Sequence, residues 1–581
     1  MRIIKRTFIF TFSVLWALSC FSQTGNAHDY SKKSGIEINN YDEKNVEDLA
    51  VLCKIWGFLK FHHPEILKGK YDWDAELFHI MPKILDSKSK RERNKILGQW
   101  VAGLGDVILS DSVLTITPEL MKMAPGTDWI EDGKNLGSVS KQLMKIKNAR
   151  RDDIEDNKQV SFPWGNSAFF LNENLYPELE TVDTGFRLLG LFRFWNAIEY
   201  YFAYKYLIDD GWENILYEFI PQFIDADDSI LSFKLCALKL ATRIEDSHTR
   251  MLNPYKIPRG FEEDKYIEDW LGKYMFPFEI SFVENKAVIT DVYSTKIYTR
   301  YPFLIGDVIY SINDEPVERI VERKLEYTPA SHYTGKLKKI AMSLHRSNDS
   351  IMSITYERNG HIISDTLKAI LVSDVDVANR TRRDLPAHQK LYNGISYIYT
   401  GATRPYALPE QFDDSKGVII DLRCYPHKLT NHSEYYPLYP EPTPFCNFTN
   451  VSRLYPGLFR FTGIANTGKE NPDYFKGKKV ILINEQAQSH PEFMAMKYKV
   501  APNTILMGSK TTGADGNYSF IGLPAETGLM FTGLGVYYPD GSETQRVGIL
   551  PDIEVKPTIK GIREGRDELL EKAIEYILQD E

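Results

Sequence analysis

Ser489 is the residue best placed for nucleophilic chemistry, because it stands between the apolar run Lys479–Ile483 and a stretch of helical pattern. As a structural residue, Ser489 would form a capping box with Glu492 at the start of a helix. As a functional residue, its hydroxyl would stand at a strand-to-helix turn, where the free N–H of His490 can stabilise an oxyanion at the positive helix end. The two interpretations are compatible, so the pattern predicts a capped helix that also presents a nucleophile.

The pair Ser247-His248 supplies a candidate base, and an internal repeat singles it out. Each copy of the repeat has apolar residues at helical spacing, which predicts two helices joined by a polar turn. At a constant offset of 139 residues, Trp56, Trp73, Pro82 and Asp86 match Trp195, Trp212, Pro221 and Asp225. The first copy has Ile108 and Leu109 where the second has the Ser-His pair. This difference indicates that only the second copy contributes to a site.

Two further regions must position these residues. The alternating, β-branched pattern of 276–372 predicts strands, and its run Phe303–Val317 resembles the L-x-x-G-D-x-I-x-x-I-N sequence of PDZ domains. The resemblance implies a domain that binds extended peptides at a sheet edge. From Ser396 the pattern becomes strand, loop and helix, and Gly417–Arg423 is typical of a buried parallel strand. Ligands bind at the carboxyl ends of such strands, where Ser489 also lies.

An ordered set of motifs completes the pattern. In chain order they are Asp421-Leu-Arg423, Asn484 to Glu492 around the serine, Gly508-Ser-Lys-Thr-Thr-Gly513, and Pro539-Asp-Gly-Ser-Glu543 running on to Asp552. Each motif is weak alone, but together they resemble the C-terminal-processing (tail-specific) serine peptidase family over about 276–552. The resemblance implies a crotonase/ClpP-like α/β peptidase core and protein or peptide substrates.

The resemblance favours the tricorn-like branch of that family. Where the processing peptidases carry a lysine base, this chain has Ala514, and Lys510 lies four residues earlier. The tricorn-like branch uses a histidine preceded by a serine, together with a glutamate near the C-terminal end. The resemblance therefore implies Ser489 as nucleophile and His248 as general base, oriented by Ser247 and Glu543. No cofactor and no metal are expected.

The loop after Arg423 departs from the family pattern. The sequence Cys424-Tyr-Pro-His427 replaces the usual glycines, and Pro426 has no N–H to donate. His427 occupies the place of the second oxyanion donor beside His490, so the loop leaves a second interpretation open. In that interpretation the chain is an inactive protein that binds peptides or small apolar ligands, as interphotoreceptor retinoid-binding proteins do on a similar core.

The predicted architecture is α/β and multidomain. Its parts are a signal peptide (1–22), helical repeat 1 (45–114), a linker or covering segment (115–183), helical repeat 2 with the Ser-His pair (184–256), a PDZ-like domain (274–372), the peptidase core (385–560) and a C-terminal helix (561–581).

Composition and the N-terminus bear on location and partners. The chain has 581 residues, 43% hydrophobic and 26% charged, with a net charge of −9 and no dense Lys/Arg run. These values are typical of a globular protein and argue against nucleic-acid binding. The basic start and apolar run of residues 1–22 predict export to the periplasm or outside the cell, with a lipid anchor at Cys20 as the alternative. No later segment is apolar enough to span a membrane. Whether Cys424 and Cys446 pair is left open.

Overall fold

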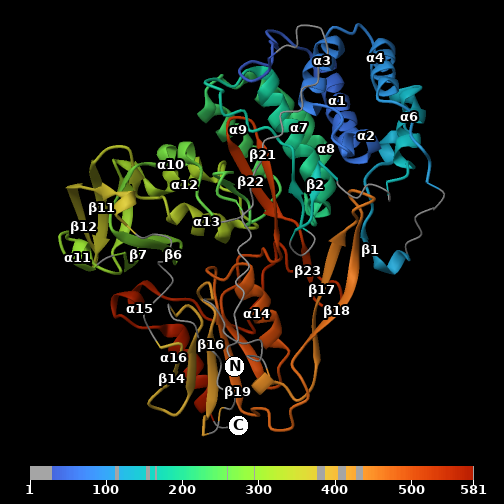
Figure 1. Cartoon of the computed structure of the whole chain (residues 1–581). Coiled ribbons are helices and arrows are strands. Elements are labelled where there is room, and N and C mark those ends of the chain that lie inside the picture. Colours follow the sequence, from blue (N-terminus) through green and yellow to red (C-terminus); the bar gives the residue numbers. More distant parts are fainter. Residues whose placement is uncertain are drawn as a thin grey trace, which may run out of the picture.

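The computed structural model describes residues 29–110, 117–151, 157–163, 167–257, 260–293, 295–375, 386–402, 412, 414–426 and 436–579. The predicted signal peptide and His427 lie outside these residues. Figure 1 shows a helical part at the top, a β-rich part beside it and an α/β part below, with β21 (Tyr518–Leu523) and β22 (Thr527–Thr532) rising into the helical part. The predicted α/β, multidomain fold class is confirmed.

The two helical copies share one packing device. In each copy the indole N–H of either tryptophan donates to the backbone carbonyl of the other, at 3.0 and 3.1 Å for Trp56 and Trp73 and at 2.9 Å both ways for Trp195 and Trp212. The paired helices are α1 (Glu43–His62) with α3 (Trp73–Leu85) and α7 (Thr184–Tyr201) with α8 (Trp212–Asp225). Each tryptophan pair thus satisfies both of its buried indole donors while it fastens two helices together.

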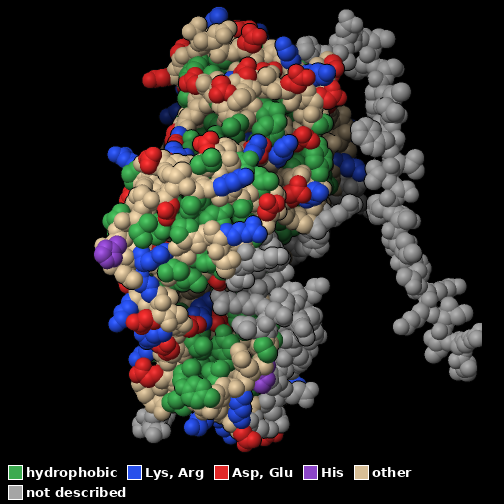
Figure 2. All heavy atoms as spheres, turned by 90° about the vertical axis from the view of Figure 1, so that its left-hand side faces the viewer, with side chains coloured by type: hydrophobic (Ala, Val, Ile, Leu, Met, Phe, Trp, Pro, Cys, Tyr) green, Lys and Arg blue, Asp and Glu red, His purple; other side chains and the backbone are tan. Residues whose placement is uncertain are grey.

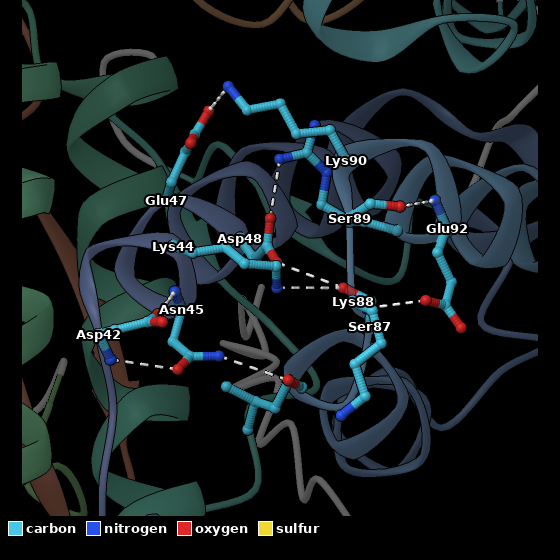
Figure 3. Close-up of polar contacts among 12 residues, drawn as sticks. Asp42, Lys44, Asn45, Glu47, Asp48, Ser87, Lys88, Ser89, Lys90 and Glu92 are labelled. Atoms are coloured by element: carbon cyan, nitrogen blue, oxygen red, sulfur yellow. Dashed lines mark hydrogen bonds and ion pairs between the residues drawn. The ribbon is translucent and has the colours of Figure 1, made fainter.

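A buried polar cluster fixes the start of α1 against α4 (Lys90–Gly103), as Figure 3 shows. The carboxylate of Asp48 accepts from the Arg93 guanidinium at 2.9 Å and from Lys44 Nζ at 2.7 Å. The side chains of Asp48 and Arg93 are fully buried. Because a buried charge needs a partner, replacing either Asp48 or Arg93 alone would leave the other charge buried without one. The pair therefore specifies how α1 and α4 pack together.

The segment between the two copies covers other parts of the molecule. Its strand β1 (Met121–Met123) pairs antiparallel with β18 (Phe459–Thr467) of the α/β part. Its helix α6 (Val139–Lys147) packs on α4, and β3 (Phe169–Phe170) joins β21. The segment therefore ties the helical part to the α/β part.

The β-rich part contains a sheet in the order β12-β11-β8-β7-β6 with two helices, α12 and α13. The strands, in chain order, are β6 (Phe278–Val283), β7 (Lys286–Val292), β8 (Val308–Ile312), β11 (Ile351–Arg358) and β12 (His361–Lys368), and the helices are α12 (Val317–Leu325) and α13 (Tyr333–Ala341). Asn313 and Asp314 both have positive φ, as a tight hairpin turn requires. Helix α13 packs on β6.

The α/β part is built on a second sheet, parallel from β15 to β24. Its order is β14 (His388–Lys390), β15 (Ser396–Tyr399), β16 (Gly417–Asp421), β19 (Lys478–Ile483), β20 (Thr504–Gly508) and β24 (Ile553–Glu554). Alternate residues of β19 face two different cores. Ile481 and Ile483 pack with Met494 of α14 (His490–Lys499), whereas Val480 and Leu482 pack with Ile577 of α16 (Glu568–Leu578). The strand is apolar from Val480 to Ile483 because helices cover both of its faces.

Strand β4 (Arg250–Leu252) lies between the second repeat and the β-rich part in the chain. It begins two residues after His248 and pairs antiparallel with β22, with Arg250 opposite Met530. This pairing brings the end of the second repeat beside the end of β22.

Two expectations about the whole chain can be compared with the structure. Among the described helices, none is long and apolar enough to cross a membrane. Cys53, Cys236, Cys424 and Cys446 are all free thiols, so the disulfide that the sequence left open between Cys424 and Cys446 is absent from the described residues.

Candidate active site

Ser489 lies in a strained turn between β19 and α14. Its backbone has φ +66° and ψ −117°, a left-handed conformation that costs a residue other than glycine about 1–3 kcal/mol. The Ser489 N–H donates to the Ala514 carbonyl at 2.9 Å and to Glu492 Oε2 at 2.9 Å. These bonds hold the turn in place, and a sharp strand-to-helix turn of this kind is where a nucleophilic serine is presented.

Glu492 is the anchor beneath this turn. Its carboxylate is 1% exposed and, besides the Ser489 N–H, accepts from Thr511 Oγ1 at 2.5 Å and from the N–H groups of Gly513 and Ala514 at 2.7 and 3.1 Å. Burial raises the pKa of Glu492, although the hydrogen bonds act in the opposite direction. The capping residue predicted from sequence therefore also fixes the 511–514 loop against the nucleophile.

His248 has a defined hydrogen-bond partner for one ring nitrogen. Its Nδ1 lies 2.8 Å from Thr532 Oγ1, at the end of β22, and the imidazole is 6% exposed. Burial lowers the pKa of His248, Asp246 raises it, and Lys339 and Arg250 lower it. Burial also lowers the pKa of Lys339 to about 7, and its Nζ donates to the Thr249 carbonyl at 3.0 Å.

The nucleophile and the candidate base are brought together by the residues that precede them. Gln488 Nε2 donates to the Ser247 carbonyl at 3.1 Å, and the Ser247 hydroxyl donates to the Thr512 carbonyl at 3.2 Å. Within the described residues, no hydrogen bond joins Ser489 directly to the His248 imidazole. Catalytic hydrogen bonds commonly tighten only when substrate is bound.

The other two predicted catalytic residues have different partners. The Ser247 hydroxyl accepts from the Ser331 N–H at 2.8 Å, so it connects the β-rich part to the 511–514 loop. Glu543 accepts from Lys122 Nζ at 2.7 Å and from the Tyr206 hydroxyl at 2.6 Å. The structure does not join Ser247 to Glu543 by a hydrogen bond, and their catalytic roles stay predictions.

The candidate oxyanion donors are only partly described. His490 is the first residue of α14, so its N–H is one of the helix donors that lack a partner within the helix. The His490 ring lies 6.4 Å from the ring of Tyr425, in the loop that follows β16 and Arg423. His427, in the same loop, is outside the described residues. The preceding Arg423 has a structural partner. It binds Asp421 and Asp567 at 2.7 Å, and Asp567 caps α16.

Sequence reasoning missed two residues at the site, Asp246 and Thr532. Asp246 precedes Ser247 directly, so its position could have drawn attention to it, whereas nothing in the sequence links Thr532 to a histidine 284 residues away. Among the described residues, no three His, Cys, Asp or Glu side chains are grouped so that they could hold a metal ion.

Comparison with known proteins gives a family match for part of the chain. Residues 448–555 match the family model of peptidase family S41. A search of curated proteins finds no match.

Three proteases are among the solved structures similar to this chain. A mutant of CPAF is 12% identical, with 68% of this chain and 98% of that chain covered and a TM-score of 0.50. The photosystem II D1 C-terminal processing protease is 14% identical, with coverages of 65% and 96% and a TM-score of 0.36. The tricorn protease is 12% identical, with coverages of 68% and 36% and a TM-score of 0.29.

The matched segment contains the nucleophile turn, the 511–514 loop and the turn that carries Glu543. Because those are the segments that the sequence motifs singled out, the family match and the motif order point to the same region. Over residues 448–555 the chain is therefore similar to peptidase family S41, and this match supports a tail-specific, serine-type protease.

Proposed function

We propose that this peptidase is an endopeptidase that cleaves proteins or peptides with Ser489 as nucleophile and His248 as general base. Ser489 Oγ attacks the scissile carbonyl carbon while His248 Nε2 accepts the hydroxyl proton, and the imidazolium then gives that proton to the leaving amine. Water repeats the sequence on the acyl-enzyme and releases the acid product. The His490 N–H is the oxyanion donor that the described residues offer.

The contact between Gln488 and Ser247 carries this proposal. It joins the residue before the nucleophile to the residue before the base at 3.1 Å, although the two lie in different parts of the molecule. Ala514, at the position of the lysine base in related peptidases, is buried and its carbonyl accepts the Ser489 N–H. A base that approaches from the helical part is therefore favoured over one from the 511–514 loop.

Labelling with a fluorophosphonate probe and digestion of casein test the proposal. Wild type should label and digest, Ser489→Ala should do neither, and His248→Ala should lose about 10²–10⁴-fold in labelling rate. Equal labelling of wild type and Ser489→Ala would show that another serine reacts. Absence of labelling and digestion in all proteins would instead favour a binding protein on this scaffold.

The β-rich part is proposed to dock the substrate peptide. Within the described residues, β6 pairs only with β7, so its other edge can accept an extended peptide beside α13. The start of α13 touches the catalytic loops, because His332 Nε2 donates to the Thr511 carbonyl at 2.9 Å. Figure 2 views this side of the molecule and shows apolar side chains interspersed with charges of both signs.

Export is the last element of the proposal. It rests on the basic and apolar pattern of residues 1–22. N-terminal sequencing of the protein recovered from a cell-envelope fractionation should find Gln23 first, whereas a lipid-modified Cys20 would show the anchored alternative.

A further inference from the structure

Thr532 stands between the candidate base and a buried carboxylate. Its Oγ1 lies 2.8 Å from His248 Nδ1 and 2.9 Å from Asp246 Oδ1. The Asp246 carboxylate is fully buried and also accepts from the Thr532 N–H at 2.6 Å, from the His248 N–H at 3.0 Å and from Gln545 Nε2 at 3.2 Å. The end of β22, the turn that carries His248 and the segment that carries Gln545 therefore all donate to the Asp246 carboxylate.

The direction of these hydrogen bonds follows from their chemistry. A carboxylate has no proton to donate, so the Thr532 hydroxyl proton must point to Asp246. The same hydroxyl can then only accept from His248, which places the imidazole proton on Nδ1. Nε2 is left with a lone pair, the form that a general base requires.

We infer that Asp246 and Thr532 are the positioning residues of His248, as a relay from Asp246 through Thr532 to Nδ1. This inference rests on the proposed function, in which His248 is the base. The relay fixes the tautomer before the reaction and leaves a negative charge two hydrogen bonds from the imidazolium that forms when His248 takes the serine proton. In this assignment the relay fills the role that the family resemblance gave to Ser247 and Glu543.

The geometry separates this role from simple loop support. The backbone of the 246–249 turn already has its own bonds, since the Thr249 N–H donates to the Asp246 carbonyl at 3.1 Å and the Ser247 N–H to Ser331 Oγ at 3.0 Å. The Thr532 hydroxyl contributes nothing to those bonds. Its two contacts are to the imidazole and to the carboxylate, which is the pattern of a group that orients a base.

The test measures the second-order rate of fluorophosphonate inactivation against pH, from about pH 5 to 9, in the full chain. Thr532→Val keeps the shape but removes the hydroxyl, and we expect a rate about 10- to 100-fold lower, part of what a general base supplies. Thr532→Ser keeps the hydroxyl and should stay within about threefold of wild type. Thr242→Val is the matched control, because the Thr242 hydroxyl donates to the Lys239 carbonyl at 2.7 Å, away from Asp246 and His248, and this variant should also stay within about threefold.

Asp246→Asn gives a second readout, the pH profile of the inactivation rate, which would not change if Asp246 only supported the loop. Three charged groups act on His248, namely Asp246, Lys339 on α13 and Arg250 on β4, and of these only Asp246 raises its pKa. Neutralising Asp246 should therefore shift the acid limb of the pH profile to lower pH. It also keeps the inference testable if Thr532→Val does not fold, as checked by circular dichroism.

The outcomes distinguish the inference from the function on which it rests. If Ser489→Ala and His248→Ala are inactive while folded Thr532→Val and Asp246→Asn match wild type in rate and pH profile, the relay is wrong and the function stands. If His248→Ala keeps the wild-type rate, the assignment of the base itself is wrong. A slower Thr532→Val together with an unshifted Asp246→Asn profile would also overturn the relay.

Discussion

Replacing Glu492 with glutamine tests whether this carboxylate holds the nucleophile turn. Glutamine keeps one acceptor oxygen and puts an amide group in place of the other. In its best orientation the glutamine oxygen takes the Oε2 position and still accepts from the Ser489 and Ala514 N–H groups. The NH2 group then takes the Oε1 position and donates to the Thr511 hydroxyl oxygen. The Gly513 N–H, now 2.7 Å from Oε1, would then face another donor.

The magnitude follows from the Gly513 N–H, the backbone donor left without an acceptor; the Thr511 hydroxyl proton also loses Oε1 as its acceptor. A buried N–H without an acceptor costs about 1–3 kcal/mol, and the cost falls on the 511–514 loop. Because each 1.36 kcal/mol is a factor of about ten, local opening should become about 5- to 150-fold more frequent. We expect the fluorophosphonate rate to fall as well, since the loop carries the Ala514 carbonyl that accepts the Ser489 N–H.

Hydrogen exchange followed by mass spectrometry is the suitable assay. Tryptophan fluorescence is not, because no tryptophan lies in residues 386–579. Peptides covering 511–515 should exchange faster in Glu492→Gln, while those covering β11 should not change. Glu485→Gln is the control, because its carboxylate accepts from Ser509 Oγ at 3.3 Å, whereas its contact with the 511–514 loop, from Thr512 Oγ1 at 2.7 Å, is to the backbone carbonyl, which the substitution keeps. Exchange within twofold of wild type at 511–515 would refute the anchoring role.

Two further predictions concern carboxylates near the site. Asp515 is buried, and its Oδ2 has no hydrogen-bond partner among the described residues. Burial, and to a smaller extent the nearby charge of Glu492, raises the pKa of Asp515 well above 3.8. The folded state then keeps a proton that the unfolded state releases above about pH 4, so wild-type stability falls as pH rises through that window. The gain in melting temperature from Asp515→Asn should be larger at pH 8 than at pH 5, and an equal gain at both would contradict this reasoning. Glu543→Gln should lower the fluorophosphonate rate less than tenfold and speed hydrogen exchange in β1, because Glu543 binds Lys122 of that strand. A loss of 10²-fold or more would instead support the catalytic role that the family resemblance implies.

The strands of the α/β part were predictable because burial on both faces makes them apolar without interruption. Lys479–Ile483 and Gly417–Arg423 in the sequence correspond to β19 and β16. The covering segment gave no such signal. Its strands β1, β2 (Val160–Ser161) and β3 have two or three residues each and depend on partners far along the chain. Periodicity needs several turns or alternations, so tertiary contacts rather than local pattern determine these pieces.

The catalytic candidates divide in the same way. Ser489 carries local marks, namely a preceding strand, a capping glutamate and a following helix, and all three are present. His248 was singled out by comparison of the two repeats, since only the second copy has it. Thr532 could not be found in this way, because a threonine at the end of a buried strand has no distinguishing local pattern. Its position matters only because β4 pairs with β22.

That pairing has a consequence for how activity depends on the whole chain. The proposed base His248 follows the second helical repeat, and the proposed nucleophile Ser489 follows a strand of the α/β sheet. The β-rich part reaches the segments beside them through Ser331 and His332. Ser247 contacts all three parts of the molecule. Its hydroxyl accepts from the Ser331 N–H and donates to the Thr512 carbonyl, and its backbone carbonyl accepts from Gln488 Nε2. Small displacements between parts would misplace His248 relative to Ser489, and catalysis loses rate steeply with such displacements. The position of Ser247 in both hydrogen-bond networks therefore makes it a coupling residue between the β-rich part and the proposed nucleophile.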